Sequence, residues 1–303
     1  MSNPKVAVLL ATYNGAAHCE TQLTSILWQR GVDVHVYVRD DGSRDATLSI
    51  LRDWAAHHPG RMTIIDNNGV STGSANGNFF MLLSAVDAKP YDYVAFADQD
   101  DVWTPDKLRR AVDRLVQDNA EGYSSDLIAY ETVANSAWVL HKAGQFADLD
   151  YLFQGGSAGC TYVLTSRAAK VAADVMAQAP AFCSDPSHDW ILYAICRSRG
   201  MKWVRDQGAE ILYRQHASNQ YGAKRGLAEI RTKLQNVRSS WYHDHILWMR
   251  HVVIGSEIER KVLDAVARGR LYDRWWLVRQ APRFRRTRAY VAQLRVAIAL
   301  GMI

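Results

Sequence analysis

Apolar runs alternate with helical patterns through the first hundred residues of this 303-residue chain, and this alternation restricts the fold more than any other feature. The first run, Lys5–Thr12, reads KVAVLLAT, which is typical of a strand buried on both faces. Residues 15–30 then carry apolar side chains at helical spacing, and valines alternate along residues 34–38. Repeated strand and helix units predict an α/β fold, a Rossmann-like and mostly parallel sheet flanked by helices.

The same periodicities assign most of the remaining chain. The pattern loosens after residue 117, where a polar stretch at 121–126 and irregular segments follow, and helix returns over most of residues 227–303 with a break near Pro282. We expect helices at 45–54, 78–86, 106–117, 166–178 and 189–199, and strands at 62–65, 91–97 and 202–205.

Charge is distributed unevenly along the chain. Residues 1–222 carry 19 basic and 25 acidic residues, whereas residues 223–303 carry 17 basic and 6 acidic ones. We therefore expect a catalytic domain over 1–222 and a helical basic C-terminal region over 223–303, which would face an anionic membrane surface. No binding of nucleic acid is expected.

Near its end, the C-terminal region combines arginines with an apolar stripe. Val291, Leu294 and Ile298 share a face at helical spacing, which is typical of a helix lying in a membrane interface. The alternative is that this stripe packs on the catalytic domain or on a second copy of the chain. No run approaches the roughly 20 apolar residues of a membrane span, so we expect a cytoplasmic protein, attached peripherally to the inner face of the membrane.

Three predicted strands end in polar residues. In open parallel sheets, ligands bind beyond the carboxyl ends of the strands. Carboxylates crowded there repel one another unless a divalent cation compensates them, and oxygen ligands suit Mn²⁺ or Mg²⁺ bridging phosphates. No phosphate-binding glycine loop follows the first strand, so the metal must bind the phosphates. The strand ends read Thr12-Tyr13-Asn14-Gly15, Asp40-Asp41-Gly42-Ser43 and Asp98-Gln99-Asp100-Asp101.

These segments, V-L-L-A-T-Y-N-G, R-D-D-G-S-R-D-A-T and F-A-D-Q-D-D-V-W in this order, resemble the GT-A domain of family-two glycosyltransferases, most closely bacterial rhamnosyltransferase-like members. The similarity continues through S-H-D-W at 187–190 and L-Y-R-Q-H at 212–216. It implies an inverting enzyme that moves a sugar, expected to be rhamnose, from a nucleoside diphosphate to a hydroxyl. The donor would be dTDP-rhamnose or a UDP-sugar, and the acceptor a glycan or a lipid-linked glycan of the cell surface.

The resemblance also implies roles for single residues. Thr12 and Tyr13 would line the nucleotide pocket, and Asp40 would read the base. Asp98 would support the ribose and the diphosphate, and Asp100 would bind the metal. His216 stands where relatives place a histidine or arginine facing the diphosphate, and both a ligand and a structural role stay open for it. The donor site would also include Asn14, Asp41, Gln99 and, although its glycine-rich segment lacks the arginine of many relatives, Asn78.

Asp189 is the expected catalytic base. Ser187 is a plausible N-cap, so Asp189 would lie in the first turn of a helix, where a carboxylate stays ionised. Such a carboxylate can take the proton of the acceptor hydroxyl while the metal stabilises charge on the leaving diphosphate. The alternative is an aspartate that only compensates the helix dipole.

The acceptor sugar is expected to lie near two further features. Gly156 precedes a strand-like stretch and could form the floor below the sugar. An exposed Trp103 could stack on a sugar face, or it could instead pack against the following helix near Leu108. His188, Trp190 and Arg214 are placed with the acceptor or the transferred sugar through the motifs that contain them.

Two other functions compete with glycosyl transfer. A sugar-nucleotide pyrophosphorylase should carry a glycine-rich loop with lysine or arginine after the first strand, where this chain has Tyr13-Asn14-Gly15. A membrane-surface module without catalysis would explain the basic C-terminal region. It would leave the aspartates unexplained, since they repel phosphate groups unless a metal intervenes.

Overall fold

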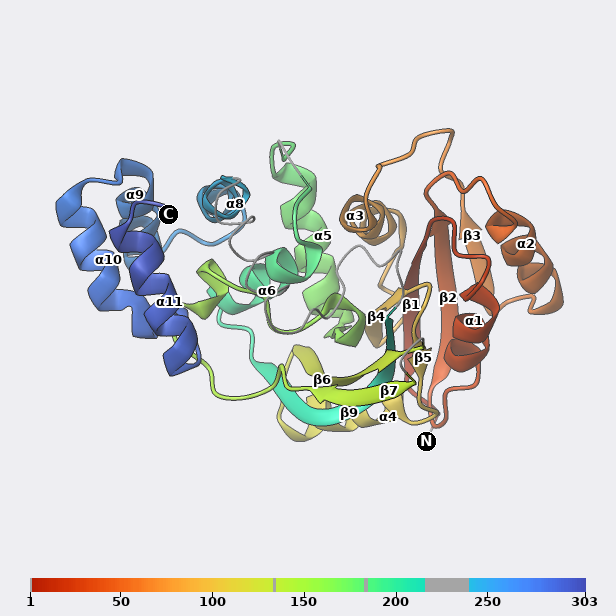
Figure 1. The fold of residues 1–303 in the computed structure, drawn as a ribbon. Helices are drawn as coiled ribbons and strands as arrows, with labels where there is room; N and C mark the ends of the chain where they lie inside the picture. The colour runs from red at the N-terminus through yellow and green to blue at the C-terminus, as the bar shows by residue number, and fades with distance from the viewer. Residues whose placement is uncertain (1, 133–134, 183–184, 216–239) are drawn as a thin grey trace.

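The computed structural model describes residues 2–132, 135–182, 185–215 and 240–303. Within these residues, nine strands form one sheet in the order β3-β2-β1-β4-β8-β6-β9-β5, with β7 beside β6 (Figure 1). The first four strands in sequence pair in parallel, as predicted. They are β1 (Lys5–Thr12), β2 (Asp33–Asp40), β3 (Met62–Ile65) and β4 (Tyr93–Asp98).

The second half of the sheet is mixed, and its central strand falls where the sequence indicated none. The polar stretch at 121–126 begins strand β6, which pairs in parallel with β9 and antiparallel with β8. Its polar side chains are buried in hydrogen bonds: Ser124 accepts one from Trp203 Nε1 at 2.9 Å, and Asp126 accepts one from the Lys142 amide at 2.6 Å. The apolar alternation of a strand is therefore missing. These strands are β5 (Val102–Trp103), β6 (Gly122–Glu131), β7 (Ser136–Leu140), β8 (Val163–Thr165) and β9 (Trp203–Gln215).

Helices cover both faces of the sheet. Alternate residues of β1 divide between two cores: Leu9 packs with α3, α5 and α6, whereas Leu10 packs with α1, α2 and α4. The helix at 166–178 has the predicted bounds, and α1 begins at Cys19 because residues 15–18 form a turn. The bounds are α1 (Cys19–Leu27), α2 (Thr47–His57), α3 (Ala75–Ala85), α4 (Lys107–Gln117), α5 (Ser166–Gln178) and α6 (His188–Ser198), with short 3-10 turns η1 (Asp150–Leu152) and η2 (Gly159–Thr161).

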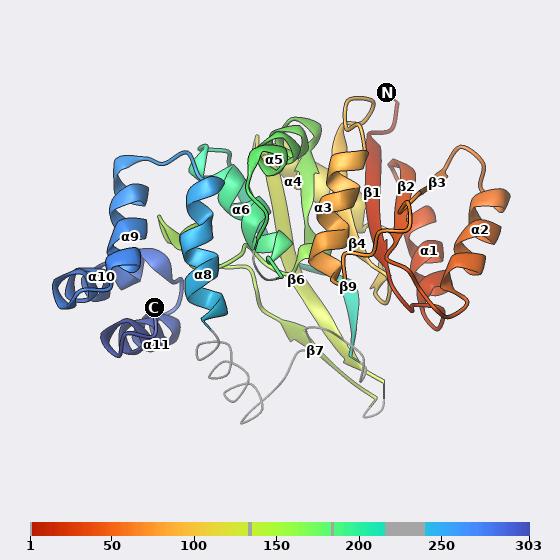
Figure 2. The same ribbon diagram turned by 90° about the horizontal axis from the view of Figure 1, so that it is seen from above.

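Helices of the C-terminal region lie together at one end of the molecule, beyond α6 (Figure 2). Ile246, Leu277 and Phe284 belong to the same hydrophobic core as Ile191 of α6. The predicted boundary at 222/223 lies outside the described residues. No described helix is both long and apolar enough to cross a membrane. The helices are α8 (Trp241–Trp248), α9 (Glu257–Arg268), α10 (Leu271–Phe284) and α11 (Arg288–Ala299), with a 3-10 turn, η3 (Met249–His251), after α8.

The apolar stripe of α11 faces the protein interior. Leu294 is 4% and Ile298 0% exposed, and Val291 packs against the same core. The interpretation of this stripe as a lipid-contacting face is therefore wrong. The stripe packs inside this chain, mainly on α10, in the core that also includes residues of the catalytic domain. Burial of these side chains is favoured because it removes apolar surface from water.

Pro282 lies within the last turn of α10, and the helix ends at Phe284, two residues beyond the proline. Proline has no N–H to offer the carbonyl four residues earlier. Arg295 of α11 takes this role, since its Nε donates to the carbonyl of Val278 at 3.2 Å. The break predicted near Pro282 thus comes just after it, and α11 folds back along α10.

Candidate active site

Sheet register brings the polar strand ends together at one edge. Thr12 lies opposite Asp40, and Ala11 lies opposite Asp98. The hydroxyl of Thr12 donates to Asp40 Oδ1 at 3.0 Å. Both side chains are almost fully buried, so their hydrogen bond fixes the ends of β1 and β2 relative to each other.

Gln99 fixes the loop that follows β1. Its Oε1 accepts from the Tyr13 amide at 2.8 Å and its Nε2 donates to the Tyr13 carbonyl at 2.8 Å. A Cβ atom on Gly15 would lie 2.1 Å from Gln99 Oε1, so a larger residue at Gly15 would displace this amide. The Tyr13 ring is 50% exposed. Gln99 therefore presents the Tyr13 ring to solvent at the site edge.

Hydrogen bonds join the loops after β1 and β2. Asn14 adopts a left-handed backbone with φ of 47°, and its Oδ1 accepts from the Arg44 amide at 2.8 Å. Asp40 Oδ2 accepts from the amides of Gly42 at 3.1 Å and Ser43 at 2.8 Å. This bonding makes one rigid unit of the two loops.

Asp41 and Asn78 bind other protein groups. Arg39 is 1% exposed, and its Nη1 donates to Asp41 Oδ1 and Asn78 Oδ1, both at 2.8 Å. Asp41 also accepts from the amides of Thr72 at 2.7 Å and Gly73 at 2.8 Å. Burial opposes ionisation of Asp41, but these donors outweigh it and lower its pKa. The two residues anchor the glycine-rich segment, residues 69–78, and their contact with the nucleotide stays a prediction.

Carboxylates from two distant segments interact at the end of β4. Burial, together with the charges of Asp100 in the same motif and of Asp189, raises the pKa of Asp98 to about 7. Asp189 comes from the start of α6, so the fold brings this residue to the edge that carries the aspartate motif. Arg214 of β9 donates from Nε to the carbonyl of Asp100 at 3.0 Å, which fixes the loop at this point.

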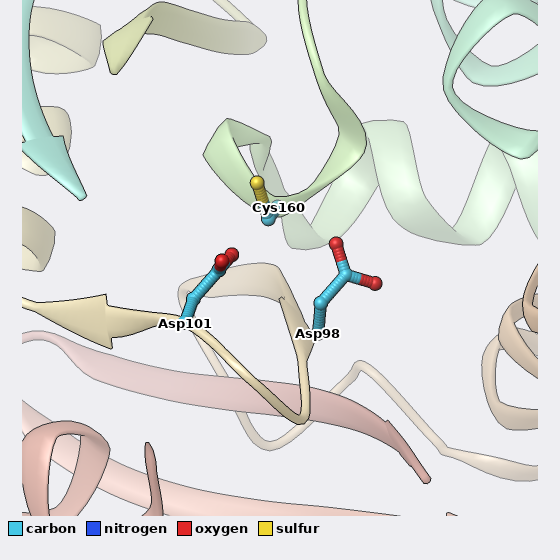
Figure 3. Close-up of side chains that lie close together, drawn as sticks. All are labelled: Asp98, Asp101 and Cys160. Carbon is cyan, nitrogen blue, oxygen red and sulfur yellow. The ribbon is translucent and has the colours of Figure 1, made fainter. Parts of the chain in front are cut away.

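A thiol lies beside this cluster. Figure 3 shows the carboxylates of Asp98 and Asp101 directed toward the η2 turn that carries Cys160, and candidate ligand atoms of the three residues lie within 4.8 Å of one another. Burial raises the pKa of Cys160 well above its ordinary value, and the charges of Asp101 and Asp98 act in the same direction. A thiol that keeps its proton is a poor metal ligand.

The carboxylates themselves fit a divalent cation. Asp98 and Asp101 bring carboxylate oxygens to within 4.8 Å of each other, Asp100 is the expected ligand beside them, and Mg²⁺ and Mn²⁺ prefer such oxygen donors. A bound cation would offset the charges of Asp100 and Asp189 that, after burial, raise the Asp98 pKa. His216, the other expected ligand, lies outside the described residues.

Trp103 is buried, contrary to expectation. It is 3% exposed, and the Lys107 Nζ lies 3.6 Å from its ring centroid. Burial lowers the pKa of Lys107 to about 7. The ring belongs to the core that includes Leu108, so the packing alternative is confirmed and stacking of Trp103 on a sugar is wrong.

The first turn of α6 carries Asp189. Ser187 occupies the N-cap position, but its hydroxyl makes no cap hydrogen bond and instead donates to Asp189 Oδ1. The Trp190 amide donates to the same oxygen at 2.6 Å. Both donors hold the carboxylate in place at the N-terminus of α6.

His188 and Trp190 hold this turn in place from inside the protein. Asn76 Oδ1 accepts from the His188 amide at 3.1 Å and binds His188 Nδ1 at 2.7 Å. Trp190 is 4% exposed and donates from Nε1 to the Tyr151 carbonyl at 2.7 Å. These contacts give the two side chains a positioning role, and their contact with a sugar stays a prediction. Asn76 connects the glycine-rich segment to the start of α6, in addition to the contact of Asn78 Nδ2 with the Thr12 carbonyl at 3.4 Å.

His245 of α8 supports the same turn. Its Nε2 accepts from the Ser187 amide at 3.1 Å, and its ring stacks on Trp190 with centroids 4.1 Å apart. Sequence reasoning assigned His245 no role, because a histidine among aromatic residues of a helix resembles ordinary packing. Burial lowers the pKa of His245 to about 3, so the ring stays neutral in the folded protein.

A pH-dependent stability follows for His245. The unfolded chain protonates this ring near its ordinary pKa of 6.5, whereas the folded protein does so only near 3. The neutral His245 ring therefore contributes its full share to the free energy of unfolding above pH 6.5. This contribution is lost as the pH falls toward 3, by about 1.4 kcal/mol per pH unit. Urea unfolding should show that wild type loses about 1 kcal/mol more than His245→Gln between pH 7 and 5.5. An equal loss in both proteins would contradict this account of His245.

Comparison with known proteins identifies the family. Residues 7–166 match the family Glycosyl transferase family 2. The dTDP-rhamnosyl transferase RfbG of Shigella flexneri is 37% identical over 241 residues, which cover 78% of this chain and 82% of that protein. This chain belongs to glycosyl transferase family 2. The prediction from its motifs is confirmed, and the pyrophosphorylase alternative is set aside.

Solved structures agree with the fold of this family-2 glycosyltransferase. TarS of S. aureus, residues 1–349 in complex with UDP, matches with a TM-score of 0.61 at 13% identity, covering 98% of this chain and 86% of that one. The same protein in complex with UDP-GlcNAc matches with a TM-score of 0.59 at 14% identity, covering 86% and 70%. At these identities the likeness establishes the shared fold alone, and it agrees with the predicted GT-A class.

Proposed function

We propose that this glycosyltransferase uses a divalent metal to transfer rhamnose, with inversion, from dTDP-rhamnose to a hydroxyl of a glycan or lipid-linked acceptor in surface polysaccharide synthesis. The observation that carries the proposal is that the start of α6, which bears Asp189, lies beside β4, which ends in the aspartate motif. The ring centroids of His188 and Phe96 are 6.1 Å apart, and the charge of Asp189 acts on Asp98. A base beside a metal-binding aspartate motif is the arrangement that such a displacement requires.

Each group has a distinct task in this reaction. Asp98 and Asp100 would hold Mn²⁺ or Mg²⁺, which when bound supplies positive charge to the leaving diphosphate. The Tyr13 ring would contact the base, with Thr12, Asn14 and Asp40 shaping the pocket around it. Asp189 would accept the proton of the acceptor hydroxyl as that oxygen attacks the anomeric carbon and the bond to the diphosphate breaks.

Gly156 and Arg214 complete the proposed surroundings of the sugar. The Gly156 amide donates to the Tyr162 hydroxyl at 2.7 Å. A Cβ atom on the neighbouring Gly155 would lie 3.3 Å from Trp190 Cα, so the turn containing Gly156 packs beside the residue that follows Asp189. We propose this turn as the floor for the acceptor sugar, and Arg214 as the residue that fixes the Asp100 loop.

The donor proposal rests on the similarity to RfbG, with a UDP-sugar as the alternative. Purified protein should be screened by thermal shift against dTDP-rhamnose, UDP-glucose and UDP-GlcNAc, each with Mn²⁺ and with chelator. A ligand at 100 times its Kd adds about 2.7 kcal/mol of stability. We expect the largest shift for dTDP-rhamnose with Mn²⁺. A shift with UDP-sugars and none with dTDP-rhamnose would reject rhamnose as the donor sugar.

We also propose that the protein attaches peripherally to a membrane, through a face of α10 instead of the stripe of α11. Leu271, Tyr272 and Trp275 of α10 are 83%, 73% and 51% exposed, opposite the buried residue Leu277. Arg279 lies 3.6 Å over the Trp275 ring. Aromatic side chains with arginine favour an anionic interface, where each basic residue contributes about 1 kcal/mol. Two copies of this basic region would repel each other, so charge favours lipid over self-association.

Flotation with vesicles tests this face of α10. Full-length protein should float at low salt with vesicles of equal parts phosphatidylglycerol and phosphatidylcholine, and Trp275→Ser should reduce the bound fraction several-fold. Trp28 is 74% exposed at the end of α1, far along the chain, so Trp28→Ser is the matched control. Equal loss in both variants, or equal binding to neutral vesicles, would count against the α10 face.

A further inference from the structure

Arg286, in the segment between α10 and α11, is buried against the catalytic domain. Its side chain is 11% exposed, and its Nε donates to Asp150 Oδ2 at 2.6 Å. Asp150 of η1 is fully buried, and Arg197 Nη1 lies 3.5 Å from its other oxygen. A buried carboxylate of this kind requires paired charge, so the fold depends on a positive charge at this point.

The other donors of Arg286 reach two consecutive carbonyl groups. Its Nη2 donates to the Gly155 carbonyl at 2.9 Å and its Nη1 to the Gly156 carbonyl at 3.4 Å. Arg205 Nε also donates to the Gly156 carbonyl, at 3.1 Å. The planar, forked guanidinium of Arg286 thus connects the carboxylate of Asp150 to the Gly155–Gly156 turn. The single ammonium of a lysine cannot make all of these hydrogen bonds.

This turn packs directly on the residues around Asp189. A Cβ atom on Gly155 would lie 3.3 Å from Trp190 Cα, so the backbone there has no room to shift toward α6. The Trp190 amide in turn donates to Asp189 Oδ1. The Gly155–Gly156 turn is thus one layer of contacts away from the carboxylate.

We propose that Arg286 is a positioning residue for the reaction: from the C-terminal region it holds the Gly155–Gly156 turn against the first turn of α6, and so fixes Asp189 and the acceptor side of the site. The proposal rests on the function proposed above for Asp189. It assigns the C-terminal region a direct part in the geometry of the active site, in addition to any contact with a membrane.

Arg286→Lys tests the proposal, because it keeps a positive charge beside Asp150 and removes the fork. Hydrogen exchange should accelerate about tenfold at the amides of residues 155–159 and 187–190, and stay unchanged at residues 12–15. The Kd for dTDP with Mn²⁺ should stay within about twofold, whereas hydrolysis of dTDP-rhamnose at saturation should fall about tenfold, since water also needs the base.

Arg288→Lys is the matched control, since Arg288 is exposed at the start of α11, and it should behave as wild type. Arg286→Gln, which also removes the charge, should show a larger loss together with a lower melting temperature. Unchanged exchange at 155–159, or an equal loss of dTDP binding and turnover, would overturn the proposal. A wild type that hydrolyses no dTDP-rhamnose would reject the donor alone, because hydrogen exchange still decides the role of Arg286.

Discussion

Asp189→Asn should lower turnover by roughly 100-fold or more while nucleotide affinity survives. Asparagine has nearly the same shape and can still accept hydrogen bonds from Ser187 and the Trp190 amide through its Oδ1, so the first turn of α6 should keep its structure. It cannot take the proton of the acceptor hydroxyl. Transfer at saturating donor, together with titration of dTDP in the presence of Mn²⁺, separates chemistry from binding.

Asp244→Asn is the matched control for this substitution, because Asp244 lies in the first turn of α8 and also faces a helix N-terminus. If Asp189 only compensated a helix dipole, both variants should lose a few tenths of a kcal/mol of stability, and neither should lose turnover. Loss of donor affinity with normal turnover at saturation would instead make Asp189 a binding residue.

Asp100→Ala should abolish detectable transfer, because the metal loses a carboxylate that we expect to bind it. Removing this charge also takes away one cause of the raised pKa of Asp98, so the metal-free protein should be at least as stable as wild type. The stabilisation that Mn²⁺ gives to wild type in the presence of dTDP should disappear. Thermal unfolding with and without the metal measures this effect independently of activity.

Asp113→Ala is the control for Asp100→Ala, since the Asp113 side chain is 64% exposed on α4. It should retain both transfer and the Mn²⁺-dependent shift. Full activity of Asp100→Ala in excess chelator would contradict the metal proposal.

The sequence predicts the first half of the sheet well because buried parallel strands consist of continuous apolar runs. β1 and β3 have the bounds expected from their residues, and the loops after β1, β2 and β4 meet at one edge because parallel strands share their direction. Strand β6, in the second half of the sheet, was not predicted because it lacks an apolar run. Its residues Ser124 and Asp126 are buried through hydrogen bonds with distant partners, and no local periodicity reports such pairing.

The motifs of the sequence assigned Asp98, Asp100 and Asp189 to the site, and in the structure the charges of Asp100 and Asp189 act on Asp98. Their chemical roles stay predictions, and the side chains that support them were harder to predict. Asn76 and Arg286 were missed because their roles depend on contacts between segments far apart in sequence. The signal that could have identified Asn76 and Arg286 is their burial. Burial cannot be read from the sequence, where Asn76 is one of several polar residues in its segment and Arg286 one of several arginines. The same limit explains why Trp103 was expected to be exposed.

Release of dTDP from dTDP-rhamnose tests the central claim most directly. Purified wild-type protein should be incubated with this donor in Mn²⁺ and, separately, in excess chelator, and the nucleotide products should be separated and quantified. We predict that dTDP accumulates with Mn²⁺, that chelator prevents it, and that Asp189→Asn slows it by roughly 100-fold. Equal release in chelator, or undiminished release by Asp189→Asn, would contradict a metal-dependent transfer that uses Asp189 as its base.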